Sequence, residues 1–136
     1  MLIYADGSAL SRFLASEPES PDWLRWAEDH ADQIVTSPLG LTELRRAADQ
    51  LDSEARQAAH SLAGTITVVR IFDQSLKPAA LATSVLSPFA ALHLGIAVAH
   101  PGVHTVATYD ITLAQVATLH RLKVISPGRP DGWWTG

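Results

Sequence analysis

The 136 residues include no cysteine. Its absence excludes a disulfide-stapled scaffold, thiolate zinc sites, iron–sulfur clusters and a cysteine nucleophile. An excess of positive charge is also missing, because 10 Lys and Arg stand against 14 Asp and Glu, for a net charge of −4. A strongly basic nucleic-acid-binding protein is therefore not expected, although a local basic patch is compatible with this composition.

Long hydrophobic runs and the common phosphate-binding or zinc-binding motifs are missing as well. The longest apolar stretch, residues 89–99, is interrupted by His93 and is shorter than the roughly 20 residues that cross a bilayer. No P-loop, G-x-G-x-x-G, H-E-x-x-H or G-x-S-x-G motif occurs. We therefore expect a soluble, cytoplasmic protein without a membrane segment, a nucleotide cofactor or zinc-hydrolase chemistry.

Strand-like and helix-like segments alternate along the chain, whose length fits a single domain over residues 1–136. Short apolar or β-branched runs predict strands at residues 2–5, 34–36, 66–71, 103–108 and 124–125. Capping and apolar spacing predict helices from Ser8, from Ser20–Pro21, from Ser37–Pro38, over 53–63, from Asp73 with a break or kink at Pro78, over 88–100 and from Asp110 to about Leu122. Residues 127–136 read as an irregular C-terminal tail.

Five strands separated by helices predict an α/β fold with three layers, in which a mostly parallel sheet of about five strands lies between helices. In such sheets, ligands bind beyond the carboxyl ends of the strands. Asp6 follows the first strand, Glu43 lies early in the helix after the second strand, and Asp110 follows the fourth strand. The three carboxylates can therefore converge on one edge of the sheet.

Converging carboxylates would repel one another by about 4 kcal/mol per pair at 4 Å and an effective dielectric constant near 20. A divalent cation such as Mg²⁺ or Mn²⁺ would remove this repulsion, because both ions prefer oxygen ligands. A metal held in this way can generate hydroxide and stabilise a phosphodiester transition state. Each residue also has a structural interpretation: Asp6 as a turn residue, Asp110 as a helix cap and Glu43 as a surface acid beside Arg46.

Five segments resemble, in the right order, the motifs of PIN-domain proteins. They are Ile3–Leu10, Val35–Leu44, Ala91–Ala97, Val106–Asp110 and Leu119–Gly128. The first has a hydrophobic strand ending in Asp, a small residue and Ser-Ala, the fourth ends in Thr-Tyr-Asp, and the last ends in Ser-Pro-Gly. The resemblance covers nearly the whole chain and is closest to the VapC-type toxins of bacterial type II toxin–antitoxin systems, particularly mycobacterial ones.

The resemblance implies a PIN-like fold and a Mg²⁺- or Mn²⁺-dependent endoribonuclease. Asp6, Glu43 and Asp110 would occupy three of the four acidic positions and hold the metal, and Ser8 would be the hydroxyl that supports them. The resemblance also implies a homodimer, an RNA substrate and a VapB-like antitoxin whose C-terminal segment lies across a hydrophobic groove beside the active site.

One departure from the family pattern bears directly on activity. The third acid of the family aligns with Ala90, and a small hydroxyl residue of the first motif is replaced by Gly7. The alanine is either an engineered inactivation or natural decay. In both cases we expect metal affinity and hydrolysis to be crippled, because even an indirect ligand contact is typically worth about 10–100-fold. The alternative is a degenerate, non-catalytic PIN-like protein that serves in binding or dimerisation.

The sequence also offers candidate residues for contacts with RNA and with the antitoxin. Three arginines are candidates for contacts with RNA phosphates: Arg12, Arg45 and Arg46. Four apolar residues of the first two predicted helices are candidates to line the antitoxin groove: Phe13, Leu14, Trp23 and Trp26. Solvated surface charges and ordinary core residues are the respective alternatives. The pair Trp133–Trp134 either folds back on the domain or contacts a partner.

Overall fold

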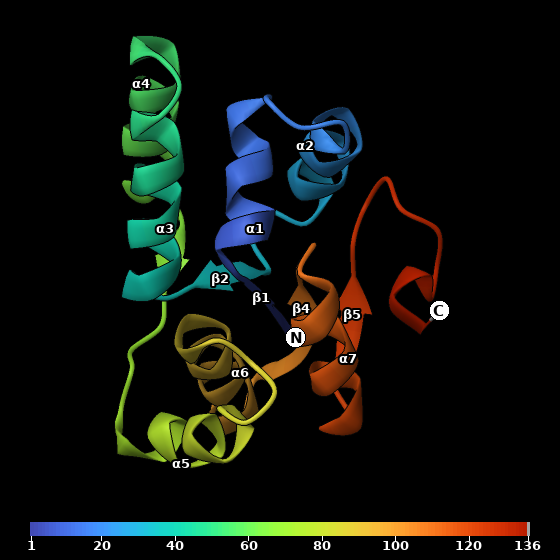
Figure 1. Ribbon diagram of the computed structural model, residues 1–136. Helices are drawn as coiled ribbons and strands as arrows, with labels where there is room; N and C mark the ends of the chain where they lie inside the picture. Colours follow the sequence, from blue (N-terminus) through green and yellow to red (C-terminus); the bar gives the residue numbers. More distant parts are fainter. Residues whose placement is uncertain (136) are drawn as a thin grey trace.

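The computed structural model describes residues 1–135, whose helices surround a central sheet (Figure 1). In chain order the elements are β1 (Leu2–Ala5), α1 (Gly7–Leu10), η1 (Ser11–Leu14), α2 (Ser20–Asp29), β2 (Ile34–Thr36), α3 (Pro38–Asp49), α4 (Ser53–Ala63), β3 (Thr67–Val68), α5 (Asp73–Ala82), α6 (Pro88–Ala99), β4 (Val103–Ala107), α7 (Ile111–Leu119), β5 (Lys123–Ile125) and η2 (Trp133–Thr135). Within this part of the chain, no helix is both long enough and apolar enough to cross a membrane.

The strands form one parallel sheet in the order β3-β2-β1-β4-β5. β1 lies at its centre, and Ala5, the last residue of β1, is in register with Ala107, the last residue of β4. Asp6 and Thr108 therefore leave the sheet side by side, although 102 residues separate them in the chain. The edge to which sequence reasoning assigns the acidic residues is built by these two strand ends.

The side chains of the sheet alternate between two cores, because successive strand residues point to opposite faces. Ile3 and Ala5 pack against helices α1–α4, whereas Tyr4 packs on the other face against α6 and its neighbours. Figure 1 shows these two groups of helices on opposite sides of the strands, with α5 and α6 together on one side. The predicted α/β fold with three layers and a parallel sheet of five strands is confirmed within residues 1–135.

Ser-Pro pairs start two helices as the sequence predicts. Ser37 caps α3 by accepting a hydrogen bond from the Gly40 N–H at 3.3 Å, and Ser87 caps α6 by accepting one from the Ala90 N–H at 3.3 Å. Each is followed by proline in the first turn, where the missing N–H costs no hydrogen bond. The helix expected from Ser20 instead has Glu19 at its cap position, with Ser20 already inside the helix.

Two predicted boundaries are wrong. The third strand spans only Thr67–Val68 rather than residues 66–71, because its sole neighbour β2 is three residues long and offers nothing further to pair with. The last helix ends at Leu119 rather than near Leu122, since Arg121 takes a φ of 65°, in the left-handed region that a helix cannot include. Both corrections depend on tertiary neighbours or backbone strain that local sequence patterns do not report.

Of the break or kink predicted at Pro78, the break does not occur, because α5 runs through this proline from Asp73 to Ala82. A proline inside a helix typically costs about 3 kcal/mol. Close contact with α6 offsets this cost: a Cβ atom on Gly95 would lie 3.0 Å from the Cβ of Ala79 and even closer to the carbonyl oxygen of Ser75. Burial between the two helices thus overrides the local preference.

The C-terminal tail folds back on the domain, as one of the two alternatives for the tryptophan pair predicts. The Gln115 side chain of α7 donates a hydrogen bond to the Trp134 carbonyl at 2.8 Å. The Arg129 guanidinium lies 4.3 Å from the centre of the Trp133 ring. The segment expected to be irregular also contains the short helix η2, and Gly136 lies outside the described residues.

Candidate active site

Asp6 stands where β1 ends and α1 begins. Its Oδ1 atom accepts hydrogen bonds from the Ala9 N–H at 2.9 Å and from the Ser8 hydroxyl at 2.7 Å. Its Oδ2 atom accepts one from the Thr108 hydroxyl at 2.6 Å. Only 3% of the residue is exposed. Asp6 therefore caps α1, rather than serving only as the turn residue of the structural interpretation, and is at the same time a buried carboxylate at the end of the central strand.

Ionisation of the Asp6 side chain is energetically unfavourable in this buried position. Burial raises the pKa of Asp6, because the ionised carboxyl group has lost its water shell. The electrostatic influence of His93 lowers this pKa, and so do the hydrogen bonds from Thr108, Ser8 and Ala9. A cation beside Asp6 would stabilise the buried charge further.

Thr108 links Asp6 to Asp110. Its hydroxyl oxygen accepts a hydrogen bond from the Asp110 N–H at 3.1 Å, and the same hydroxyl donates a hydrogen bond to Asp6. The Ser8 hydroxyl accepts a hydrogen bond from the Tyr109 N–H at 2.8 Å, which adds a second link between the same two loops. The Asp110 side chain caps α7 through Oδ1, at 3.0 Å from the Thr112 nitrogen. The first and fourth motifs are thus joined into one hydrogen-bonded unit.

Glu43 reaches the same region from α3 because residue 7 is glycine. A Cβ atom on Gly7 would lie 2.5 Å from the Cβ of Glu43 and would also collide with its carboxyl group. The departure from the family pattern at position 7 therefore makes room for the Glu43 side chain against Gly7, the residue that follows Asp6. Glu43 remains about one-third exposed, so it can meet a ligand from solvent.

A buried chain of polar groups supports Glu43 from behind. Glu43 Oε1 is hydrogen-bonded to Nε2 of His93, whose Nδ1 lies 2.6 Å from the Tyr4 hydroxyl. That hydroxyl in turn lies 2.8 Å from the Ser37 hydroxyl. Sequence reasoning treated His93 as a satisfied buried histidine and missed this contact with Glu43. The signal that could have found it is the presence of both residues in adjacent PIN-like motifs.

Ala90 occupies the first turn of α6, where the family pattern has its third acid. The residue is buried, and its methyl group belongs to the core beneath the sheet. The oxygens of Asp6, Glu43 and Asp110 suit Mg²⁺ or Mn²⁺ in kind. Among residues 1–135, however, no group of three His, Asp or Glu side chains is arranged to hold a metal ion. The donors match a divalent cation in type but not in arrangement.

The three candidate arginines differ in surroundings. Arg12 is nearly buried: its guanidinium pairs with Glu19 at 3.1 Å, donates to the Ser8 carbonyl at 3.0 Å and lies 4.2 Å from the centre of the Tyr109 ring. Arg45 and Arg46 are exposed on α3, close in sequence to Glu43. Arg12 thus links Glu19, Ser8 and Tyr109 in the interior of the domain. Of the three candidates, the two arginines on α3 are the ones exposed to solvent.

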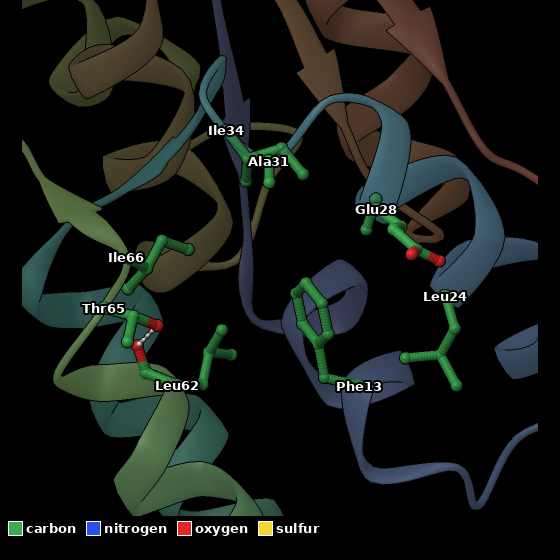
Figure 2. A pocket seen from close by; sticks show the side chains of 9 residues that line it. Phe13, Leu24, Glu28, Ala31, Ile34, Leu62, Thr65 and Ile66 are labelled. Carbon is green, nitrogen blue, oxygen red and sulfur yellow. Dashed lines mark hydrogen bonds between the residues drawn. The ribbon is translucent and has the colours of Figure 1, made fainter.

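Of the four residues predicted to line an antitoxin groove, Phe13 lines an apolar hollow of about 320 Å³ (Figure 2). Phe13 lies on one wall and faces Leu62 and Ile66 across the opening, with Leu24 of α2 beside it. Leu14 lines a second hollow of about 420 Å³, which Phe13 also borders.

The two tryptophans proposed for the groove lie elsewhere. Trp23 is fully buried in the core, so it is not on the surface of any groove in this structure. Trp26 is half-buried, stacks on His30 with ring centres 4.5 Å apart, and borders a hollow beside the C-terminal tail. Large aromatic side chains satisfy both a core and an interface, and the sequence pattern does not distinguish the two.

Comparison with known proteins places this geometry in context. The sequence model of the PIN domain matches residues 3–128. The structure resembles VapBC2 from Rickettsia felis, solved bound to a DNA fragment from their promoter, with a TM-score of 0.71 and 12% identity over 92% of this chain and 98% of that one. It also resembles FitAcB from Neisseria gonorrhoeae, with a TM-score of 0.69 and 18% identity over 95% of this chain and 100% of that one. No curated protein sequence matches the chain significantly.

Proposed function

This chain belongs to the PIN domain family, and on that premise we propose that it is the toxin of a type II toxin–antitoxin pair, of VapC type. Its chemistry is divalent-metal-dependent cleavage of RNA phosphodiester bonds in the cytoplasm. The observation that carries the proposal is the unit built from Asp6, Ser8 and Thr108 at the end of the central strand, with Glu43 pressed against Gly7 beside it.

In this proposal the carboxylates of Asp6, Glu43 and Asp110 would hold Mg²⁺ or Mn²⁺, which requires these side chains to move closer together than they lie in the structure. Such an ion, when bound, supplies hydroxide at neutral pH and compensates the charge of the phosphodiester. Ser8 fixes the orientation of Asp6, and Thr108 fixes the spacing between Asp6 and Asp110. Because Ala90 adds no oxygen, metal affinity and hydrolysis are strongly reduced in this chain.

A cleavage assay on labelled single-stranded RNA tests the proposal. We expect Ala90→Asp to cut RNA in Mg²⁺ or Mn²⁺ at least about tenfold faster than the chain itself, because a carboxylate returns to the third acidic position. Ala90→Asn is the matched control, since it has nearly the same shape without the charge. Equal, robust cleavage by the chain and by Ala90→Asp would contradict the claim that Ala90 reduces activity. A folded Ala90→Asp variant without any metal-dependent cleavage would contradict the proposed ribonuclease function.

A second candidate function is a non-catalytic PIN-like protein that acts in binding or dimerisation. The observation that favours it is the hydrogen bond between Glu43 and His93, which occupies a carboxylate oxygen that a metal would need. The same assay decides between the two functions, because only a degenerate protein stays inactive when the third acid is restored.

The partner in our proposal is a VapB-like antitoxin whose apolar segment enters the hollow of Figure 2. Support comes from the lining, which is apolar around Phe13 and carries one acidic side chain, Glu28, at its rim. Phe13→Asp should therefore abolish antitoxin binding in a pull-down with the cognate antitoxin, and undiminished binding would contradict this assignment.

The remaining contacts in the proposal are with RNA and with a second copy of the chain. Arg45 and Arg46 reach RNA phosphates, whereas Arg12 stays in its ion pair with Glu19. The homodimer uses exposed apolar side chains, of which Leu81 and Val85 are prominent near the end of α5. Sedimentation at micromolar concentration tests the dimer, and a purely monomeric chain would contradict it.

A further inference from the structure

A hollow beside Glu43 carries groups that metal-ion chemistry does not use. It has a volume of about 410 Å³ and lies between α3 and the first turn of α6. Its polar side chains come from Thr42, Glu43, Arg46 and Gln50, and its apolar surface includes Leu39 and Phe89. Glu43 therefore belongs at once to the candidate active site and to the wall of this hollow.

Phe89 presents an aromatic ring to the hollow that the rest of the described chain does not use. The residue is 57% exposed, and none of the aromatic pairs within residues 1–135 includes it. It immediately precedes Ala90 in the first turn of α6. An exposed ring at the rim of a hollow that combines apolar surface with a few polar side chains is a platform on which a flat ligand can stack.

Arg46 supplies positive charge on the opposite wall. Its side chain is exposed, and within the described residues it takes part in no ion pair. It lies one helical turn after Glu43, so both point from the same side of α3. The side chain of Gln50, one further turn along, offers both a hydrogen-bond donor and an acceptor.

We propose that this hollow binds an unpaired nucleobase of single-stranded RNA, with Phe89 stacking on the base and Arg46 contacting the adjoining phosphate. The inference rests on the proposed ribonuclease function and names its substrate class. Proteins read single-stranded RNA by combining aromatic stacking with cationic contacts to the backbone, whereas the bases of a duplex are already stacked and paired. Gln50 contacts the polar edge of the base.

The position of the hollow gives it a role in choosing the cleavage site. Glu43 forms part of the wall, so a base held against Phe89 brings a neighbouring phosphodiester to the carboxylates. Arg46 offsets the repulsion between Glu43 and that phosphate. The hollow thus selects which bond is presented, while Asp6 and Asp110 lie outside it.

Binding of fluorescein-labelled single-stranded RNA to the full chain, followed by fluorescence anisotropy, tests the proposal, because the chain itself carries Ala90 and turnover is minimal. Phe89→Ala should weaken binding at least about fivefold, and Phe89→Trp should restore it. Arg46→Ala should lower the salt dependence, the slope of log K against log[salt], by about 0.7. Leu119→Ala, at an exposed apolar residue at the end of α7, is the control and should bind as the unchanged chain does. A duplex of the same sequence should bind more weakly.

Three results would overturn the inference. Unchanged RNA binding by Phe89→Ala, together with cleavage by Ala90→Asp, would remove the base subsite and leave the proposed function intact. Conversion of a dimer to a monomer by Phe89→Ala, seen in sedimentation, would assign the ring to a contact between two copies instead. Absence of RNA binding by every variant, together with inactivity of Ala90→Asp, would refute the ribonuclease function itself.

Discussion

At the scale of single residues, the site depends on the absence of a Cβ atom at Gly7 and on the buried carboxylate of Asp6. Gly7 leaves the space in which the Glu43 side chain lies. The carboxyl group of Asp6 is buried, and this burial raises its pKa. Hydrogen bonds from Ala9, Ser8 and Thr108 offset part of the free-energy cost of burying this carboxylate.

Gly7→Ala tests the role of the glycine. The new methyl group would collide with the Cβ of Glu43, so the variant should lose about 1–3 kcal/mol of unfolding free energy, measured by urea denaturation. Gly64→Ala is the control, because its nearest new contact would be 3.6 Å away and its cost should stay within about 0.5 kcal/mol. Equal stability of the two variants would mean that Glu43 does not need the space.

The residues at strand ends could be predicted from sequence, whereas their cross-links could not. Asp6, Ser8 and Asp110 follow short apolar runs, and the parallel sheet brings such positions to one edge. The hydrogen bond between Glu43 and His93 joins residues 50 apart in the chain, and the side-chain directions that create it come from two helices packed by the tertiary fold. Only the resemblance to PIN-domain motifs related the two positions in advance.

At the scale of elements, local sequence patterns predicted the positions of most helices. The elements that differ from the prediction are those whose length or continuity depends on a neighbour in the tertiary fold. The Ser37–Pro38 cap predicted the start of α3, and Pro88 predicted the start of α6, because both signals are local to the first helical turn. The length of β3 depends on β2, and the passage of α5 through Pro78 depends on α6. Information about a partner element is absent from the segment itself, which is why the short β3 and the continuous α5 were not predicted.

Gly95→Ala tests the contact between α5 and α6. A methyl group at position 95 would be forced against the carbonyl of Ser75 and the side chain of Ala79, so the helices must separate. We expect a loss of about 1–3 kcal/mol in unfolding free energy, despite the better helix propensity of alanine. A thermal melt that shows the variant as stable as the unchanged chain would contradict the close contact.

At the scale of the whole molecule, one ionic cluster joins the two ends of the chain. Glu19 pairs with Arg12 at 3.1 Å and with Arg129 at 3.0 Å, and both arginines lie over the ring of Tyr109. Tyr109 in turn donates a hydrogen bond to the Pro127 carbonyl at 2.7 Å. The cluster fixes the loop between Thr108 and Asp110, so the tail takes part in shaping the candidate site.

The cluster predicts a pH dependence of stability. Burial works to raise the pKa of Glu19, but hydrogen bonds and charge from Arg129 and Arg12 outweigh it and hold the pKa below its usual 4.5. The stabilisation is therefore fully present above pH 4.5 and is lost as the pH falls through the lowered value. Glu19→Gln should unfold more easily at pH 6, by about 1–2 kcal/mol in urea, and the difference should vanish near pH 3. A constant difference over that range would contradict the assignment.

The gathering of Asp6, Glu43 and Asp110 around one divalent cation is tested most directly by crystals of the Ala90→Asp variant grown with Mn²⁺. An anomalous difference map should show a single strong peak within about 2.0–2.6 Å of carboxylate oxygens from these residues and from the restored aspartate. A map without a peak at the carboxyl end of β1, or with Mn²⁺ bound only elsewhere on the surface, would contradict a metal-dependent nuclease.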